Sequence, residues 1–158
     1  MIFVTLGSQK FQFNRLLIEL DKLKENNKID DVIFAQIGYS DYKPKNFEYK
    51  EFVDRDEFQK AMNESDIVIA HGGTGAIITA VKQGKKVIGI PRLAKYGEHV
   101  DDHQIQLVKE FEQSGLIKAV YGEKELGNVL NEIRSMKFKE YKSNTENIIK
   151  DIEEFIGG

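Results

Sequence analysis

The stretch IVIAHGGTGAIITAVKQGKKVIGI, residues 67–90, decides the fold class of this 158-residue chain. It opens with an apolar run at 67–70, continues into a glycine-rich segment at 71–75, and then carries residues that are compatible with a helix. Gly84 is placed to end that helix, and a second apolar run follows at 87–90. Strand, glycine-rich turn, helix and strand in this order predict one complete βαβ unit.

The glycine-rich segment is the first candidate for a binding site. Glycine lets the backbone approach a ligand closely, and the first turn of a helix presents unpaired N–H groups, so a phosphate is the natural occupant. The alternative is a tight strand-to-helix turn that simply needs glycine. The segment matches neither the Walker pattern nor the dinucleotide pattern Gly-x-Gly-x-x-Gly. The binding interpretation includes His71, Gly72, Gly73, Thr74 and Gly75, with the Thr74 hydroxyl and backbone N–H groups as donors.

Strand-like and helix-like segments alternate along the whole chain. Outside the βαβ unit at 67–90, we predict strands at 2–6, 32–37, 47–53 and 117–121, and helices at 14–24, 54–62, 101–114, 123–133 and 143–156. Asn14, Asp54 or Asp56, and Asp101 are placed to begin three of these helices, and the alternating pattern at 47–53 favours a strand near a sheet edge. The alternation predicts an α/β fold, a Rossmann-like, doubly wound and mostly parallel sheet with helices on both faces.

Several candidate segments follow predicted strands. In open α/β sheets, ligands bind at the carboxyl ends of the strands, so these segments should converge on one crevice. Besides the glycine-rich segment, they are the turns at Gly7-Ser8, Gly38 and Val53. The turn at Gly7-Ser8 could supply further donors to the same anion, although it also fits an ordinary loop.

The phosphate interpretation favours a nucleotide or nucleotide-sugar site, so residues 1–142 are expected to form a Rossmann-like domain that binds a nucleotide-sugar donor, and residues 143–158 a C-terminal amphipathic helix. The apolar stripe of that helix includes Ile148, Ile152 and Phe155. Such a stripe usually packs on the core of its own domain. On a domain of this size, it could instead dock on another chain.

Composition excludes several classes of function. The net charge of −3 offers no basic field for nucleic acid, and the absence of cysteine rules out disulfides and thiolate sites and suits the cytosol. The first residues, MIFVTLGS, lack the basic region of a signal peptide. No stretch reaches the roughly 18 apolar residues of a spanning helix, so we expect membrane contact only through a partner or a surface helix.

The second candidate for a binding site is a polar cluster, EHVDDHQ at 98–104, which follows the strand predicted at 87–90. Its carboxylate, imidazole and amide groups suit hydrogen bonds to sugar hydroxyls. The alternative is a set of helix-capping acids and solvated histidines. A metal site built from His99, Asp102 and His103 is disfavoured because their spacing matches no standard ligand pattern.

Taken in order, these pieces resemble a known family, the MurG-type GT-B glycosyltransferases with a family 28 C-terminal domain. The likeness is greatest to small catalytic subunits of split enzymes, namely the eukaryotic dolichyl-diphosphate GlcNAc transferase and bacterial capsule and exopolysaccharide transferases of the PssE and CpsG kind. The motifs that carry it are TLGSQ at 5–9, EFVD at 51–54, HGGTGAI at 71–77, GKKVIGIPR at 84–92 and EHVDDHQ at 98–104.

The resemblance implies roles by position. Gly7 and Ser8 would face the donor diphosphate or the acceptor side, and the glycine-rich segment would hold the pyrophosphate. Phe52 and Val53 would hold the base, while Asp102 and Gln104 would bind sugar hydroxyls. One position departs from the pattern: Thr79 stands where the family carries a carboxylate for the ribose, and Glu98 is a possible substitute.

The resemblance also implies the reaction. A hexose from a UDP-sugar such as UDP-galactose would move to a lipid-diphosphate-linked acceptor in capsular or exopolysaccharide synthesis, without a metal or other cofactor. The source of the catalytic base stays open, with Glu98 and His99 as candidates in this chain. A membrane-anchored subunit would bind the acceptor and recruit this cytoplasmic chain to the inner face of the membrane. In isolation, the chain could instead associate with itself. The alternative function is a non-catalytic module that binds a nucleotide sugar or regulates another protein.

Overall fold

The computed structural model describes residues 1–7, 9–140 and 150. Six parallel strands of this part form one sheet in the order β3-β2-β1-β4-β5-β6. The strands are β1 (Ile2–Thr5), β2 (Ile33–Gln36), β3 (Glu48–Lys50), β4 (Ile67–His71), β5 (Lys86–Ile90) and β6 (Lys118–Ala119). The predicted α/β, Rossmann-like, parallel sheet is therefore confirmed.

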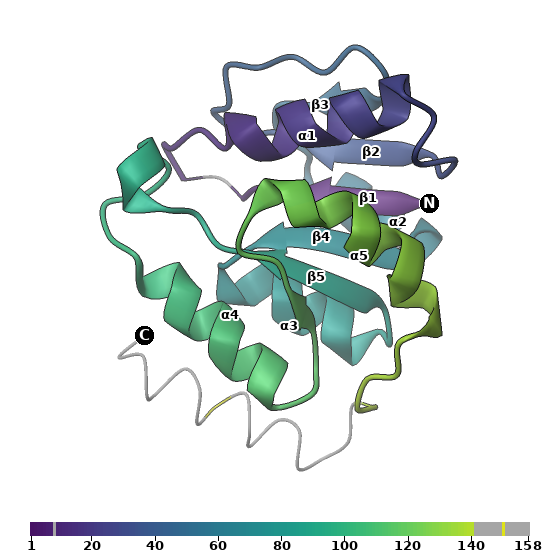
Figure 1. Ribbon diagram of the computed structural model, residues 1–158, viewed down its shortest axis with the longest axis vertical. Coiled ribbons are helices and arrows are strands. Elements are labelled where there is room, and N and C mark those ends of the chain that lie inside the picture. Colours follow the sequence, from purple (N-terminus) through teal and green to yellow (C-terminus); the bar gives the residue numbers. More distant parts are fainter. Residues whose placement is uncertain (8, 141–149, 151–158) are drawn as a thin grey trace.

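Helices cover both faces of the sheet (Figure 1). They are α1 (Asn14–Glu25), α2 (Arg55–Glu64), α3 (Thr74–Lys82), α4 (His103–Gln113) and α5 (Leu126–Glu132), with 3-10 turns η1 (Ala94–Tyr96), η2 (Glu123–Glu125) and η3 (Ile133–Ser135). In the view of Figure 1, α1 and α5 lie in front of the sheet, and α2 and α3 lie behind it.

The core is split by the sheet into two apolar clusters. Along β4, Ile67 and Ile69 join the cluster under α1 and α5, while Val68 and Ala70 join the cluster under α2, α3 and α4. Successive side chains of a strand point to opposite faces, so a strand covered on both faces needs a continuous apolar run. This requirement explains why the apolar runs within residues 67–90 predict strands so clearly.

Among the described strands, the edge strand β3 is the one with exposed residues. Glu48 and Lys50 are exposed and Tyr49 is half-buried, which confirms the predicted edge position. The loop that leads into β3 is organised by Asp21 of α1. Its carboxylate accepts hydrogen bonds from the Tyr42 hydroxyl (2.5 Å), the Lys45 N–H (3.0 Å) and the Asn46 N–H (2.8 Å).

Helix starts differ in part from the prediction. Asp54 caps α2 by accepting the Glu57 N–H at 2.8 Å. The prediction for Asn14 is wrong, because Phe13 is the N-cap of α1 and the Asn14 side chain accepts the N–H groups of Asp41 and Tyr42 instead. Helix α4 begins at His103, two residues after the predicted start.

The predicted C-terminal helix at 143–158 lies outside the described residues, apart from residue 150. Within the described part of the chain, no helix is both long enough and apolar enough to cross a membrane.

Candidate functional site

The strand order changes direction between β1 and β4. From β1 the chain winds outward to β2 and β3, and it then returns to β4 on the other side of β1 before winding out to β5 and β6. Open α/β sheets bind their ligands at this kind of switch point, outside the carboxyl ends of the strands. A pocket of about 510 Å³ lies there. Its lining comprises Thr5, Gly7, Gln9, Gln36, Val53, Asp54, Arg55, Phe58, His71, Gly73, Gly75 and Ala76. We call it the switch-point pocket.

The glycine-rich turn forms one wall of this pocket. Gly73 is the N-cap of α3, in extended conformation, so the first amides of the helix follow directly. A Cβ on Gly73 would lie 2.4 Å from Cε1 of His71, and a Cβ on Gly72 would lie 2.5 Å from Cβ of Gln104. Close packing therefore requires glycine at both positions, whereas a Cβ on Gly75 would meet nothing within 4 Å. Gly75 is open on the pocket side.

Gly7 faces this turn from the end of β1. Its φ of +72° is a left-handed conformation that favours glycine, and a Cβ there would lie 2.7 Å from Nε2 of His71. A Cβ on Gly38, which follows β2, would in turn lie 2.8 Å from the carbonyl oxygen of Gly7. The ends of β1, β2 and β4 thus converge as the sequence predicted. Ser8, predicted beside Gly7, lies outside the described residues, as does the side chain of Thr74.

His71 is the one imidazole in the lining of the switch-point pocket. Burial lowers its pKa to about 4; the positive charges of Arg92 and His99 act in the same direction, while a hydrogen bond with Gln104 opposes them. The ring is therefore neutral at pH 7. Nδ1 accepts the Gly73 N–H at 3.2 Å, which places the ring proton on Nε2, beside Gly7. In this state His71 offers a ligand a hydrogen-bond donor.

The two residues predicted to hold the nucleotide base, Phe52 and Val53, lie in different surroundings. Val53 lines the switch-point pocket. Phe52 does not; its side chain is 45% exposed and meets Tyr39 edge-to-face at 5.2 Å between ring centroids. Neighbouring Asp54 and Arg55 supply the charged groups of the lining.

Three polar side chains of the segment 98–104, those of Glu98, His99 and Asp102, make contacts within the protein. The Glu98 carboxylate is 1% exposed and accepts both Nε and Nη2 of Arg15, at 2.8 and 3.1 Å, as well as the Leu93 N–H at 2.9 Å. Asp102 is exposed and accepts the Ala94 N–H at 2.9 Å. His99 lies against Phe11, with 5.4 Å between ring centroids. None of these three side chains belongs to the described lining of the switch-point pocket.

Gln104 holds the glycine-rich turn against the end of β5. Its Oε1 accepts the N–H groups of Gly72 (3.0 Å) and Arg92 (3.1 Å), and its Nε2 lies 3.3 Å from Nδ1 of His71. Direct binding of sugar hydroxyls by Gln104 and Asp102 stays a prediction. In this structure, both residues shape loops around the site.

Thr79, the position that departs from the pattern implied by the resemblance, makes its side-chain hydrogen bond within its own helix. Its hydroxyl donates to the Gly75 carbonyl at 3.0 Å, within α3, and Thr79 does not line the switch-point pocket. The metal interpretation gains no support either, because the described residues contain no cluster of His, Asp and Glu that could hold an ion.

The sequence reasoning missed two arginines near the site. Arg55 lines the switch-point pocket and directly follows the helix cap Asp54, so the rule that functional residues follow strand ends could have found it. Arg92 is 1% exposed, and its side chain contacts the loop after β1. Nothing in the local sequence indicates that an arginine after Pro91 is buried.

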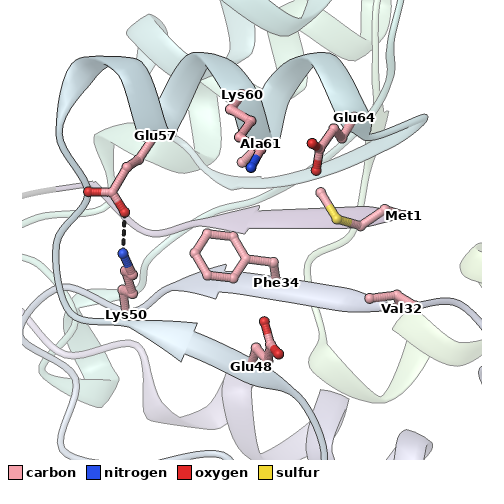
Figure 2. A pocket seen from close by; sticks show the side chains of 9 residues that line it. All are labelled: Met1, Val32, Phe34, Glu48, Lys50, Glu57, Lys60, Ala61 and Glu64. Carbon is pink, nitrogen blue, oxygen red and sulfur yellow. Dashed lines mark hydrogen bonds and ion pairs between the residues drawn. The ribbon is translucent and has the colours of Figure 1, made fainter.

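A second pocket, of about 280 Å³, lies between α2 and the first strands. Figure 2 shows Phe34 of β2 on its floor, with Glu57, Lys60 and Glu64 of α2 above it and Lys50 paired with Glu57. None of the candidate residues from the sequence lines this pocket.

Comparison with known proteins identifies the class to which this fold and site belong. Residues 1–156 match the glycosyltransferase family 28 C-terminal domain, so the chain belongs to this family. The resemblance found in the sequence is thereby confirmed.

Two curated relatives are similar over part of their length. The UDP-N-acetylglucosamine transferase subunit ALG13 of Debaryomyces hansenii is 28% identical over 114 residues, which cover 67% of this chain and 54% of that protein. The subunit of the same name from Kluyveromyces lactis is 35% identical over 63 residues, which cover 40% of this chain and 30% of that protein. The aligned part thus spans about half or less of these relatives.

Solved structures share the fold. An NMR structure of ALG13 has a TM-score of 0.63 at 18% identity and covers 99% of this chain and 96% of its own. The glycotransferase of kitacinnamycin reaches 0.62 at 15% identity, over 98% of this chain and 38% of its own. MurG of Acinetobacter baumannii has a TM-score of 0.54 at 17% identity and covers 96% of this chain and 49% of its own.

Proposed function

We propose that this chain is the donor-binding subunit of a glycosyltransferase that uses a UDP-sugar. One observation carries the proposal: the glycine-rich turn of a family 28 domain forms a wall of the switch-point pocket. The curated relatives are subunits of a UDP-N-acetylglucosamine transferase, which favours a uridine nucleotide as the carrier.

The site has the groups that a departing diphosphate needs. In the transfer, the bond between the sugar C1 and the diphosphate oxygen breaks, and the acceptor hydroxyl oxygen bonds to C1. Negative charge then grows on the diphosphate, and preorganised donors stabilise it. The first amides of α3, the positive end of its dipole and the Nε2–H of neutral His71 can fill this role.

A general base must also remove the proton of the acceptor hydroxyl. Asp54, the carboxylate of the pocket lining, caps α2 through the Glu57 N–H, and Nδ1 of His71 accepts the Gly73 N–H. Glu98 is tied to Arg15 and Leu93, away from the pocket lining. We therefore assign the base to a second, membrane-anchored subunit, which also binds a lipid-diphosphate-linked acceptor and recruits this chain to the inner face of the membrane.

Two donors are the main candidates. UDP-N-acetylglucosamine follows from the names of the curated relatives. A UDP-hexose such as UDP-galactose follows from the resemblance to capsule and exopolysaccharide transferases, and would place the chain in the synthesis of those polymers.

Calorimetry on the purified chain tests the donor assignment. UDP and at least one UDP-sugar should bind, with ADP and GDP at least about tenfold weaker, because a base-specific site rejects a base that leaves its hydrogen-bonding groups unpaired. Equal binding of all three nucleotides, or no binding, would overturn the proposal. A second assay follows the transfer of label from each UDP-sugar to a lipid-linked acceptor, with and without the co-expressed membrane-anchored subunit. It separates a catalytic subunit from a non-catalytic binding module.

A further inference from the structure

We propose that Arg92 is a positioning residue of the donor site, which sets the spacing between the turn after β1 and the glycine-rich turn after β4. The inference rests on the proposed function for its ligand, but its geometry concerns this chain alone.

The two terminal nitrogens of the Arg92 guanidinium donate to backbone carbonyls, whereas its buried Nε has no hydrogen-bond partner among the described residues. Nη1 donates to the carbonyl oxygens of Phe11 (2.9 Å), Gln12 (3.2 Å) and Glu98 (3.4 Å), and Nη2 donates to that of Leu6. Leu6 directly precedes Gly7. The side chain of Arg92 therefore anchors both ends of the loop after β1 from a position beyond β5.

The main chain of Arg92 reaches the other turn. Its N–H donates to Oε1 of Gln104 at 3.1 Å, and the same oxygen accepts the Gly72 N–H at 3.0 Å. Gln104 is packed so closely against Gly72 that no Cβ fits between them. One residue thus connects to the turns after β1 and β4, both of which contribute to the lining of the switch-point pocket.

The His71 ring fills the space between these two turns. Side chains on Gly7 or Gly73 would collide with it, at 2.7 Å from Nε2 and 2.4 Å from Cε1. A shift of the turn after β1 therefore changes what surrounds Nε2, the nitrogen that carries the ring proton. Because Arg92 holds that turn, it also controls the donor that His71 presents.

The burial of a full positive charge supports a role beyond packing. Burial lowers the pKa of Arg92 to about 10, so the group stays charged at pH 7, and the nearby Glu98 raises the pKa in part. The Glu98 carboxylate, however, binds Arg15 directly. Removing a charge from water is unfavourable, and an apolar residue at this position would avoid that penalty. A cation close behind the turns adds positive potential where a diphosphate would lie.

Arg15 provides a matched control in the same cluster. Its guanidinium carbon lies 5.2 Å from the Phe13 ring centroid, and that of Arg92 lies 5.3 Å away. Arg15 donates to Glu98, Glu123 and the Pro91 carbonyl, all outside the two pocket turns. Both arginines can be replaced by lysine, which keeps the charge but loses the planar fork.

The test compares Arg92→Lys, Arg15→Lys and Arg92→Met by NMR and calorimetry, with thermal unfolding to verify that each variant folds. Without ligand, the amide resonances of Gly7, Gly72 and Gly73 should shift in Arg92→Lys and stay in place in Arg15→Lys. Arg92→Met should in addition raise the pKa of His71, since it removes one of the two charges, those of Arg92 and His99, that lower it.

With UDP as the probe, Arg92→Lys should weaken binding about tenfold, as expected when hydrogen bonds of a charged group are lost, and Arg15→Lys by less than about twofold. Equal shifts and equal affinities in the two lysine variants would overturn the inference. If the wild-type chain does not bind UDP, the proposed function fails, and the ligand-free resonances still decide the role of Arg92. If Arg92→Met does not fold, Arg92→Lys decides it.

Discussion

Nε2 of His71 lies so close to Gly7 that any side chain at that position would collide with it. A Cβ on Gly7 would lie 2.7 Å from this nitrogen, although Gly7 follows β1 and His71 ends β4. The contact joins the ends of β1 and β4 at the point where the strand order reverses. It is a direct contact between the two turns that we assign to the diphosphate of the donor.

Replacing Gly7 tests this contact directly. Gly7→Ala should weaken UDP binding by more than about tenfold, because the methyl group displaces the His71 ring while the left-handed backbone adds about 1–2 kcal/mol of strain. Gly84→Ala is the matched control. Gly84 has nearly the same φ, +73°, but a Cβ there would meet nothing within 4 Å. That variant should lose similar stability and bind UDP normally; equal loss of binding in both would point to general destabilisation.

Gly75→Ala should separate stability from binding. Gly75 lies in the first turn of α3 with free space around it, so alanine should raise the free energy of unfolding by about 0.5–1 kcal/mol through helix propensity. Because Gly75 lines the switch-point pocket, the added methyl group should nevertheless weaken UDP binding. Urea unfolding and calorimetry on the same preparation measure the two effects. A more stable variant with unchanged affinity would place the diphosphate elsewhere.

The buried His71 predicts a pH-dependent loss of stability. The unfolded chain protonates this histidine below pH 6.5, whereas the folded chain resists protonation until about pH 4. Its contribution to stability is therefore present above pH 6.5 and is lost as the pH falls toward 4. The difference corresponds to about 3 kcal/mol at about 1.4 kcal/mol per pKa unit.

Urea unfolding of the wild type and of His71→Gln between pH 7 and pH 4.5 measures this term. The free energy of unfolding should fall less steeply in the variant, since glutamine does not titrate. Parallel curves for the two proteins would show that His71 is not buried in its neutral form.

Asp21 should be essential for the loop before β3. Burial tends to raise its pKa, but hydrogen bonds from Tyr42, Lys45 and Asn46 outweigh burial and lower it. The Tyr42 hydroxyl, as the donor, has its pKa raised to about 12. Asp21→Ala leaves these donors unsatisfied and should cost about 2–3 kcal/mol of stability, whereas Tyr42→Phe removes one bond and should cost about 1 kcal/mol. Thermal unfolding compares them; similar small losses would argue against an organised loop.

The sequence predicts the fold well because the signal for it is local. Both faces of β4 are covered, so Ile67, Val68, Ile69 and Ala70 must all be apolar, and the run is visible without any structure. The polar edge strand β3 and the cap at Asp54 are recognised for similar reasons. The convergence of strand ends follows from topology alone.

The missed features depend on contacts between distant segments. The Arg92 side chain binds carbonyls about 80 residues away, and Gln104 holds a turn 32 residues earlier. Asn14 has the residue type of a helix cap, yet its oxygen serves a loop 27 residues later. Residue type and spacing do not determine such partners, because each depends on how the loops fold over the strand ends.

The central claim is that UDP binds in the switch-point pocket, and an NMR titration of the labelled chain with UDP tests it most directly. The account predicts that the largest amide shifts fall on Gly7, Val53, Gly73 and Gly75, and that they saturate together. Absence of any shift, or shifts gathered on Lys50, Lys60 and Glu64 around the second pocket beneath α2, would contradict it.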